Sequence, residues 1–185
     1  MYFVSQDTQT YCGVASSTMV LNALVPKEDR PTTLAWCPYH LFAQSNFFTK
    51  EVKKIAPRKQ VAKSGMTLQQ LGDVLKTFPV HVDVTHASDT TNVAFRTELI
   101  DALKSSDRCV IVNVLRTGVG QVGGGHFSPI AAFHKDSDSF LVYDVARYKY
   151  PPAWVKSTDV WHAVNTIDSD SQMTRGYLLV EKIAK

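Results

Sequence analysis

Residues 12–24 read CGVASSTMVLNAL, and the fold class follows from where this stretch places a cysteine. After Gly13 the apolar residues recur at the spacing of a largely buried α-helix, which ends at Leu24, before Pro26. Cys12 would lie at the N-terminus of that helix, where backbone N–H groups and the helix dipole favour a thiolate over a thiol. A buried, inert cysteine has the same appearance in sequence, so the position alone does not identify a nucleophile.

Outward from this helix, the chain changes character near residue 108. Helical spacing of apolar residues predicts further helices over about 67–78 and from about 92 to 103. Beyond Arg108, β-branched and aromatic runs predict strands at 109–115, 127–133, 140–144 and 176–181. Helices followed by strands indicate an α+β fold. We expect one domain, residues 1–185, with a helical lobe at about 1–107 and an antiparallel β-rich lobe at about 108–185.

Composition excludes several classes of protein. The chain has 185 residues, of which 44% are hydrophobic, and at this length roughly 70% of the unfolded surface can be buried without disulfide or metal staples. A net charge of +3 is too small to indicate nucleic acid or a membrane surface as the main partner. Three dispersed cysteines cannot form a full disulfide framework. The sequence shows no apolar run of membrane-spanning length and no signal peptide.

A second motif, GGGHFSP at residues 123–129, places His126 where a glycine-rich loop enters an apolar strand. The polar segment 134–139 predicts a hairpin with its turn centred near residues 135 to 136. Paired positions then sum to about 270 to 272, which puts His126 opposite or diagonal to Asp144 and on the same side of the hairpin. The alternative is that Asp144 caps a turn beside a satisfied core histidine.

Together these residues meet the requirements of nucleophilic catalysis. A carboxylate beside an imidazole fixes its tautomer and stabilises the imidazolium, which a Cys-His pair needs. The sequence thus offers Cys12 as nucleophile, His126 as base and Asp144 as the orienting acid. An upstream amide on Gln6 or Gln9 would join the Cys12 backbone N–H in binding an oxyanion, although a lone glutamine is more often a surface polar residue. The other cysteines and histidines contain no complete metal-ligand spacing, so no protein metal site is expected.

Ordered motifs give the sequence a resemblance to the phytochelatin synthase family, in its short, prokaryotic-type form. They are YCGVAS (11–16), GHFSPI (125–130) and DVARYKYPP (144–152), and LNAL (21–24) and RGY (175–177) extend the likeness over nearly the whole chain. The resemblance implies a papain-like cysteine-peptidase fold. In that fold a helical lobe carries the nucleophile, and an antiparallel β-rich lobe that follows it carries the histidine and the aspartate.

The resemblance also implies an activity, that of a glutathione γ-glutamylcysteinyltransferase. Cys12 would attack the Cys–Gly carbonyl of glutathione, and His126 would protonate the departing glycine. The γ-Glu-Cys thioester that remains would pass to a second glutathione or to a growing phytochelatin, in response to heavy metal. Gln6 would help to hold the oxyanion. The resemblance assigns the γ-glutamyl end of the substrate to four residues, namely Asn113, Gly125, Asp168 and Arg175, and chemically an aspartate suits the amine and an arginine the carboxylate.

The expected partners are therefore glutathione and phytochelatin peptides, with no nucleic acid and no membrane, and a homodimer is compatible with the resemblance. We expect no tightly bound cofactor, because a heavy metal ion such as cadmium or zinc would enter as a thiolate complex of the substrate. We expect a soluble protein, either cytoplasmic or exported by a signal segment upstream of Met1.

Three alternatives stay open at this point. The first keeps the same chemistry but releases γ-glutamylcysteine and glycine, because water takes the acyl group. The second is a general papain-like peptidase, which would need an extended substrate cleft and would not need Asp168 or Arg175. The third is a thiol and metal-binding module without turnover.

Overall fold

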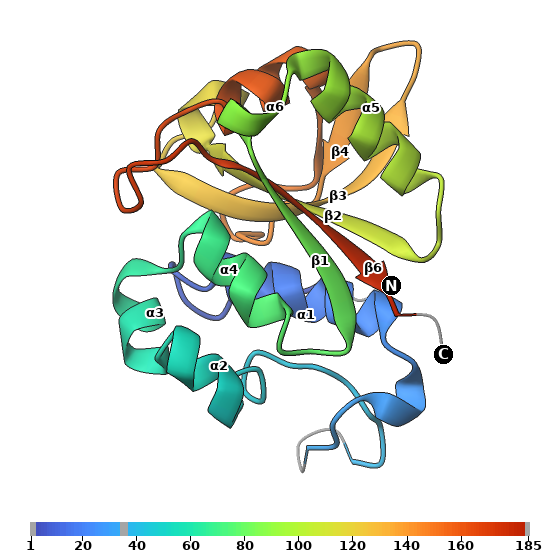
Figure 1. Ribbon diagram of the computed structural model, residues 1–185, viewed down its shortest axis with the longest axis vertical. Helices are drawn as coiled ribbons and strands as arrows, with labels where there is room; N and C mark the ends of the chain where they lie inside the picture. The colour runs from blue at the N-terminus through green and yellow to red at the C-terminus, as the bar shows by residue number, and fades with distance from the viewer. Residues whose placement is uncertain (1–2, 34–36, 184–185) are drawn as a thin grey trace.

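The computed structural model describes residues 3–33 and 37–183, so Met1 and Tyr2, which open the segment considered for a signal peptide, lie outside the described residues. The architecture is the expected α+β class, in which an antiparallel sheet lies between two layers of helices (Figure 1). The helices are α1 (Cys12–Leu24), α2 (Lys50–Ile55), α3 (Arg58–Ser64), α4 (Leu68–Leu75), α5 (Asn92–Leu103) and α6 (Ser157–Val164). The strands are β1 (Val80–His86), β2 (Arg108–Leu115), β3 (Gly125–His134), β4 (Ser139–Val142), β5 (Ala153–Lys156) and β6 (Gly176–Lys182).

The three predicted helices are present, and their ends have local causes. Helix α4 begins after Thr67, whose side chain accepts a hydrogen bond from the backbone of Gln70 while the Gln70 side chain bonds back to Thr67. Helix α5 begins after Thr91 with a similar side-chain cap. Helices α2, α3 and α6 were not predicted. Helices α2 and α3 have six and seven residues and bury one residue each, and Ser157 and Ala163 are two of the four buried residues of α6, so none of the three shows a clear apolar period.

The sheet has the strand order β1-β6-β2-β3-β4-β5, and each neighbouring pair is antiparallel. The predicted hairpin of β3 and β4 is confirmed, with Ile130 opposite Val142 and His134 opposite Ser139. A bulge between Ile130 and Ala132 shifts the register by one residue. Strand β4 ends at Val142, so the prediction of a strand through Asp144 is wrong at its end, and Asp144 lies just beyond the strand.

The sheet begins earlier in the chain than residue 108. Strand β1 pairs with β6 along its whole length, from Val80 opposite Lys182 to His86 opposite Gly176. Helix α5 also packs on the sheet, against β2 and β3. From the segment expected to form the helical lobe, β1 is therefore part of the sheet itself and α5 covers one of its faces.

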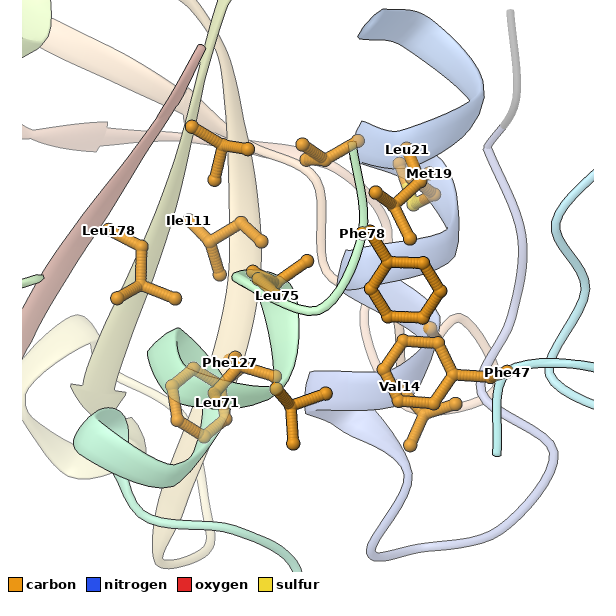
Figure 2. Close-up of a cluster of buried hydrophobic side chains, with 14 of the residues drawn as sticks. Val14, Met19, Leu21, Phe47, Leu71, Leu75, Phe78, Ile111, Phe127 and Leu178 are labelled. Atoms are coloured by element: carbon orange, nitrogen blue, oxygen red, sulfur yellow. The ribbon is translucent and has the colours of Figure 1, made fainter. Parts of the chain in front are cut away.

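One hydrophobic cluster packs α1 and α4 against one face of the sheet, the face opposite to α5 and α6. Helix α1 is buried all round, since every residue but Ala23 is buried. Figure 2 shows Leu71 and Leu75 of α4 beside the sheet residues Ile111 and Phe127, and Val14 of α1 beside Phe47; the other labelled members of the cluster are Met19, Leu21, Phe78 and Leu178. This packing fixes α1 against β3 and so determines where Cys12 lies relative to His126.

A second cluster lies on the other face of the sheet, under α5 and α6 (Figure 1). Because successive side chains of a strand point to opposite faces, Ile111 joins the first cluster while Val110 and Val112 join the second. The central strand β2 is thus covered on both faces, which explains its unbroken run of apolar residues. Within residues 3–33 and 37–183, no helix combines the length and the apolar composition that crossing a bilayer requires.

We predict that Gly176→Ala destabilises the fold strongly. A Cβ atom at this position would lie 2.0 Å from the backbone oxygen of Thr85, because β1 and β6 approach closely here. Relief requires the strands to separate, so we expect a loss of about 3 kcal/mol in the free energy of unfolding, measured by urea denaturation. Gly124→Ala is the control, since nothing lies within 4 Å of its added Cβ, and an equal loss in the two variants would contradict the steric argument.

Candidate active site

The first turn of α1 holds the thiol of Cys12 against strand β3. Ser16, one turn further along α1, donates from its hydroxyl to the carbonyl of Phe127 at 3.3 Å, and so ties the helix to the strand. Cys12 itself is the first residue of the helix and is 9% exposed. The N-cap residue Tyr11 makes no side-chain capping bond, and the N–H of Gly13 in the first turn hydrogen-bonds to the Cys12 sulfur and lowers its pKa.

Two opposing effects act on the Cys12 thiol. Burial raises its pKa, but the hydrogen bond to His126 and the positive charge of that ring act against burial and lower it. The backbone N–H groups of Phe127 and Gly13 lower it further. The net effect is a pKa below that of an ordinary cysteine, which favours the nucleophilic thiolate.

His126, the second residue of β3, connects Cys12 to Asp144. Its Nε2 lies 2.8 Å from Oδ1 of Asp144, so the predicted proximity of this histidine and this aspartate is confirmed. Because a carboxylate only accepts, Nε2 carries a proton, and Nδ1 is the nitrogen left for the hydrogen bond to Cys12. Burial lowers the pKa of His126, but the hydrogen bonds to Asp144 and Cys12 and their negative charges outweigh it, so the net pKa is raised. A lowered cysteine and a raised histidine pKa together favour a thiolate-imidazolium pair.

The carboxylate of Asp144 has more partners than the sequence indicated. Burial raises its pKa, but hydrogen bonds from His126 and Arg116 and from the backbone N–H of Ala146 hold the pKa well below its usual range. Arg116 donates to both oxygens, from Nη1 to Oδ2 at 2.7 Å and from Nη2 to Oδ1 at 3.1 Å. Asp144 therefore remains a carboxylate of fixed orientation, as the third member of a Cys-His pair requires.

Sequence reasoning did not find Arg116, and no local signal could have pointed to it. It lies 28 residues from Asp144, in a short 3-10 helix (Arg116–Val119) that follows β2, and it is 4% exposed. Its guanidinium also donates to Gln121 and lies 5.2 Å from the centre of the Tyr150 ring. A Cβ on Gly123 would lie 2.8 Å from Cδ of this arginine, which explains one glycine of the GGG run.

A polar pocket of about 180 Å³ opens beside Cys12. Six of the nine residues singled out from the sequence line it, namely Gln9, Cys12, Asn113, Gly125, Asp168 and Arg175. Gln9, the second glutamine considered as an oxyanion donor, is thus at the pocket wall. The other residues of the wall are Thr10, Ser64, Gly65, Met66, Phe127, Ser169 and Asp170. Residues 64–66 form a wall that sequence reasoning missed, because nothing in the segment between α3 and α4 indicated a site.

Arg175 and Asp168 lie together in this pocket. Nη1 of Arg175 lies 3.5 Å from the Asp168 carboxylate and 3.4 Å from Oδ1 of Asn113, and all three side chains are buried. A Cβ on Gly125 would lie 2.4 Å from the same Nη1, so only glycine leaves room for the guanidinium. The long contacts leave the arginine with unused hydrogen-bonding capacity toward the pocket.

Gln6, the expected oxyanion donor, is not among the residues that line the pocket. Its backbone N–H donates to the Val145 carbonyl at 2.8 Å, next to Asp144. The side-chain nitrogen donates to the Thr8 carbonyl at 2.8 Å and to the Tyr148 hydroxyl at 3.1 Å. Both N–H groups of the amide are therefore engaged, and a bond to an oxyanion would have to replace one of them.

Larger cavities elsewhere among the described residues contain none of the nine candidate residues. They are a mainly apolar groove of about 370 Å³ along the C-terminal half of α1, a cavity of about 620 Å³ beside Arg30 and residues 38–41, and one of about 290 Å³ beside Asn22 and residues 41–45. Among residues 3–33 and 37–183, no three His, Cys, Asp or Glu side chains are grouped so that they could hold a metal ion.

The chain belongs to the phytochelatin synthase family, because the model of that family matches residues 1–177. The similar proteins are named glutathione gamma-glutamylcysteinyltransferases. Glutathione gamma-glutamylcysteinyltransferase 3 of Lotus japonicus is 36% identical to this chain over 185 residues, which is 100% of this chain and 37% of that protein. Glutathione gamma-glutamylcysteinyltransferase 1 of Triticum aestivum is 36% identical, over 98% of this chain and 35% of that protein. The Schizosaccharomyces pombe protein is 26% identical, over 96% of this chain and 41% of that protein.

The chain thus spans little more than a third of the length of the plant relatives that it matches. Among solved structures, it is similar to the N-terminal peptidase C39 like domain of a toxin secretion ATP-binding protein from Vibrio parahaemolyticus. The TM-score is 0.33 at 12% identity, and the match covers 64% of this chain and 72% of that one.

We predict that iodoacetamide modifies Cys12 faster at neutral pH, and with a shallower pH dependence, than it modifies Cys109. The lowered pKa of Cys12 increases the fraction of thiolate, which is the form that reacts. Burial raises the pKa of Cys109 to about 11, so its modification should rise about tenfold per pH unit. In His126→Asn, Cys12 loses the hydrogen bond and the positive charge that act most strongly against its burial, so its rate should depend more steeply on pH. Peptide mass spectrometry between about pH 6 and pH 8 measures all three, and a steep profile for Cys12 in the unmodified protein would contradict the ion pair.

Proposed function

We propose that this protein transfers the γ-glutamylcysteinyl group of glutathione to a second thiol peptide and thereby makes phytochelatins. The observation that carries the proposal is the position of Cys12, bonded to His126, at the wall of a pocket that also contains Asp168 and Arg175. The names of the similar proteins support the same activity. The chain acts as one catalytic domain, since residues from the helical part and from the sheet both line the pocket.

The first step is acylation of Cys12. Its thiolate attacks the carbonyl carbon between the cysteinyl and glycyl residues of glutathione, and the tetrahedral oxyanion is bound by the Cys12 backbone N–H. Gln6 joins that oxyanion site by exchanging its bond to the exposed Tyr148 hydroxyl. As the intermediate collapses, the His126 imidazolium gives its proton to the glycine nitrogen. Glycine leaves, a thioester remains, and Asp144 stabilises the charged ring until that proton is given up.

The γ-glutamyl end of glutathione occupies the pocket. This group carries an α-ammonium and an α-carboxylate, and the pocket offers a buried carboxylate on Asp168 and a buried guanidinium on Arg175. Asn113 orients the guanidinium, and Gly125 leaves room for it. Such a pocket binds a free amino acid head group and rejects the interior of an ordinary peptide, which distinguishes this function from that of a general peptidase.

The second step returns the acyl group to an acceptor. The amine of a second glutathione or of a phytochelatin attacks the thioester carbonyl, neutral His126 takes the amine proton, and the Cys12 thiolate leaves. Water at the same position would release γ-glutamylcysteine instead. Soft metal ions such as cadmium or zinc act through the acceptor, since two glutathione thiolates bind one ion and present their amines together.

The first test is mass spectrometry of the products formed from glutathione with and without cadmium. We expect (γ-Glu-Cys) chains ending in glycine, together with free glycine, and we expect Cys12→Ser to form neither the thioester nor the products. Asp144→Asn should lower the rate of glycine release about a thousandfold, and it should also lower the melting temperature, because it leaves the buried Arg116 guanidinium without its carboxylate.

The possible outcomes separate the alternatives. Glycine and γ-glutamylcysteine without longer chains would make the protein a glutathione hydrolase, and cleavage of ordinary peptides would make it a general peptidase. Activity in Cys12→Ser would refute the proposed nucleophile. With S-methylglutathione as acceptor, the rate should no longer depend on cadmium, and continued dependence would indicate a metal bound by the protein.

A second prediction concerns the pocket. Arg175→Ala should reduce kcat/KM for glutathione about 100-fold, because the substrate carboxylate would be buried without a partner. Arg108→Ala is the matched control, since this arginine lies on the neighbouring strand and pairs with Glu181 at the surface. Steady-state release of glycine measures both variants, and equal kinetics in the two would place the γ-glutamyl group elsewhere.

A further inference from the structure

His86 is a buried histidine that the proposed reaction does not use. It is the last residue of β1, is 5% exposed, and lies opposite Gly176, the residue after Arg175, in the sheet. We propose that His86 is a positioning residue that fixes Arg175 for the α-carboxylate of the γ-glutamyl group, and so determines how strongly the enzyme selects that carboxylate. This inference rests on the proposed function.

The turn that begins at His86 is joined to the two residues before β6 by four hydrogen bonds. Nδ1 of His86 bonds to the carbonyl of Thr174. The N–H of Ala87 donates to the carbonyl of Arg175 at 2.8 Å, and the N–H of Ser88 donates to the Thr174 hydroxyl at 3.0 Å. The Thr174 hydroxyl in turn donates to the Ser88 hydroxyl at 3.2 Å. The imidazole bond is the one among these four that joins a side chain of β1 to the backbone of residue 174, so a substitution at His86 removes it alone.

Gly176 allows the hydrogen bonds between residues 86–88 and residues 174–175 to form. A Cβ at that residue would lie 2.0 Å from the Thr85 carbonyl oxygen and 3.0 Å from Cα of His86, so the two strands approach more closely than any other residue would allow. The close approach brings the His86 imidazole within hydrogen-bonding distance of the Thr174 carbonyl, two residues before Gly176. His86 and Gly176 therefore act on the same short segment.

The Arg175 side chain depends on this backbone because its own contacts are weak. Its described bonds to Asn113 and Asp168 are 3.4 and 3.5 Å long and both use the same nitrogen, while Nε has no partner among the described residues. Such a side chain is oriented mainly by the backbone that carries it and by the space left by Gly125. A shift of the Thr174 carbonyl would thus move the guanidinium relative to the bound carboxylate.

The hydrogen bonding of the imidazole itself favours a positioning role. A carbonyl only accepts, so Nδ1 carries a proton, and in the Nδ1–H tautomer of the ring Nε2 is an acceptor. Nε2 is buried and has no partner among residues 3–33 and 37–183. A buried acceptor without a donor is unfavourable, and an apolar side chain would avoid it. Folding stability alone therefore does not favour a histidine over an apolar residue at this position. The hydrogen bond to Thr174 does, because it requires a side chain that can donate to a carbonyl.

The test compares glutathione with 4-aminobutanoyl-Cys-Gly, which lacks only the α-carboxylate. Release of glycine follows acylation with either substrate, whether the acyl group then passes to a peptide or to water. The unmodified protein should prefer glutathione by about 100-fold in kcat/KM, as Arg175 implies. His86→Leu should reduce this preference about tenfold, through a higher KM for glutathione, with kcat/KM for the analogue and the melting temperature little changed.

Two further variants make the result specific. His86→Asn places an amide donor where Nδ1 was and should restore most of the preference. His81→Leu makes the same change at an exposed position of the same strand and should leave the preference unaltered. If His86→Leu does not fold, His86→Gln replaces it, because its amide reaches the position of Nε2 and cannot donate to Thr174 without moving.

Each result decides between distinct conclusions. An unchanged preference in His86→Leu, or an equal loss with both substrates, would overturn the positioning role while leaving the proposed function intact. If the unmodified protein accepts both substrates equally, Arg175 does not bind the α-carboxylate, and the proposed recognition of the γ-glutamyl group fails together with the role of His86.

Discussion

The contact between the first turn of α1 and strand β3 is the constraint on which the rest of the structure depends. Cys12 can act as a thiolate only where an imidazole and helix N–H groups offset the effect of its burial, and both conditions hold at this one place. The position is maintained by a helix that is buried all round, with Ser16 bonded to Phe127 beside His126. The large apolar core therefore serves the site directly, since a rotation of α1 would separate the thiol from the ring.

Two buried arginines extend this arrangement, and in each case a glycine makes the room. Arg116 binds both oxygens of Asp144 and occupies space that a side chain at residue 123 would fill. Arg175 lies against Asp168 in the pocket and occupies space that a side chain at residue 125 would fill. A buried guanidinium is unfavourable unless it is paired, so each arginine is placed beside a carboxylate. The glycine-rich loop before β3 thus accommodates side chains, which distinguishes it from a loop that binds phosphate with its backbone.

Sequence reasoning succeeded where the relevant contacts are local or follow from strand register. Helical periodicity placed Cys12 at a helix N-terminus, and the hairpin register brought His126 beside Asp144 even though a bulge shifts the pairing by one residue. Arg116 was not predicted, because its hydrogen bonds to Asp144 span 28 residues and depend on a short 3-10 helix after β2. The grouping of Arg175 with its pocket partners came from the family resemblance alone, since spacing along the chain gives no hint that these segments meet.

The structure also separates two tasks that a cysteine acyltransferase must perform. The charges around Asp144 maintain the protonation state of the reacting pair, and they lie behind His126, away from the polar pocket. The charges around Arg175 line the pocket itself. Arg116 is engaged by Asp144, so among the described residues that line the pocket Arg175 is the guanidinium with spare hydrogen-bonding capacity for a carboxylate. Under the proposed function, recognition of the γ-glutamyl group would therefore vary without altering the thiolate-imidazolium pair, and the proposed role of His86 would affect selectivity while leaving the chemistry unchanged.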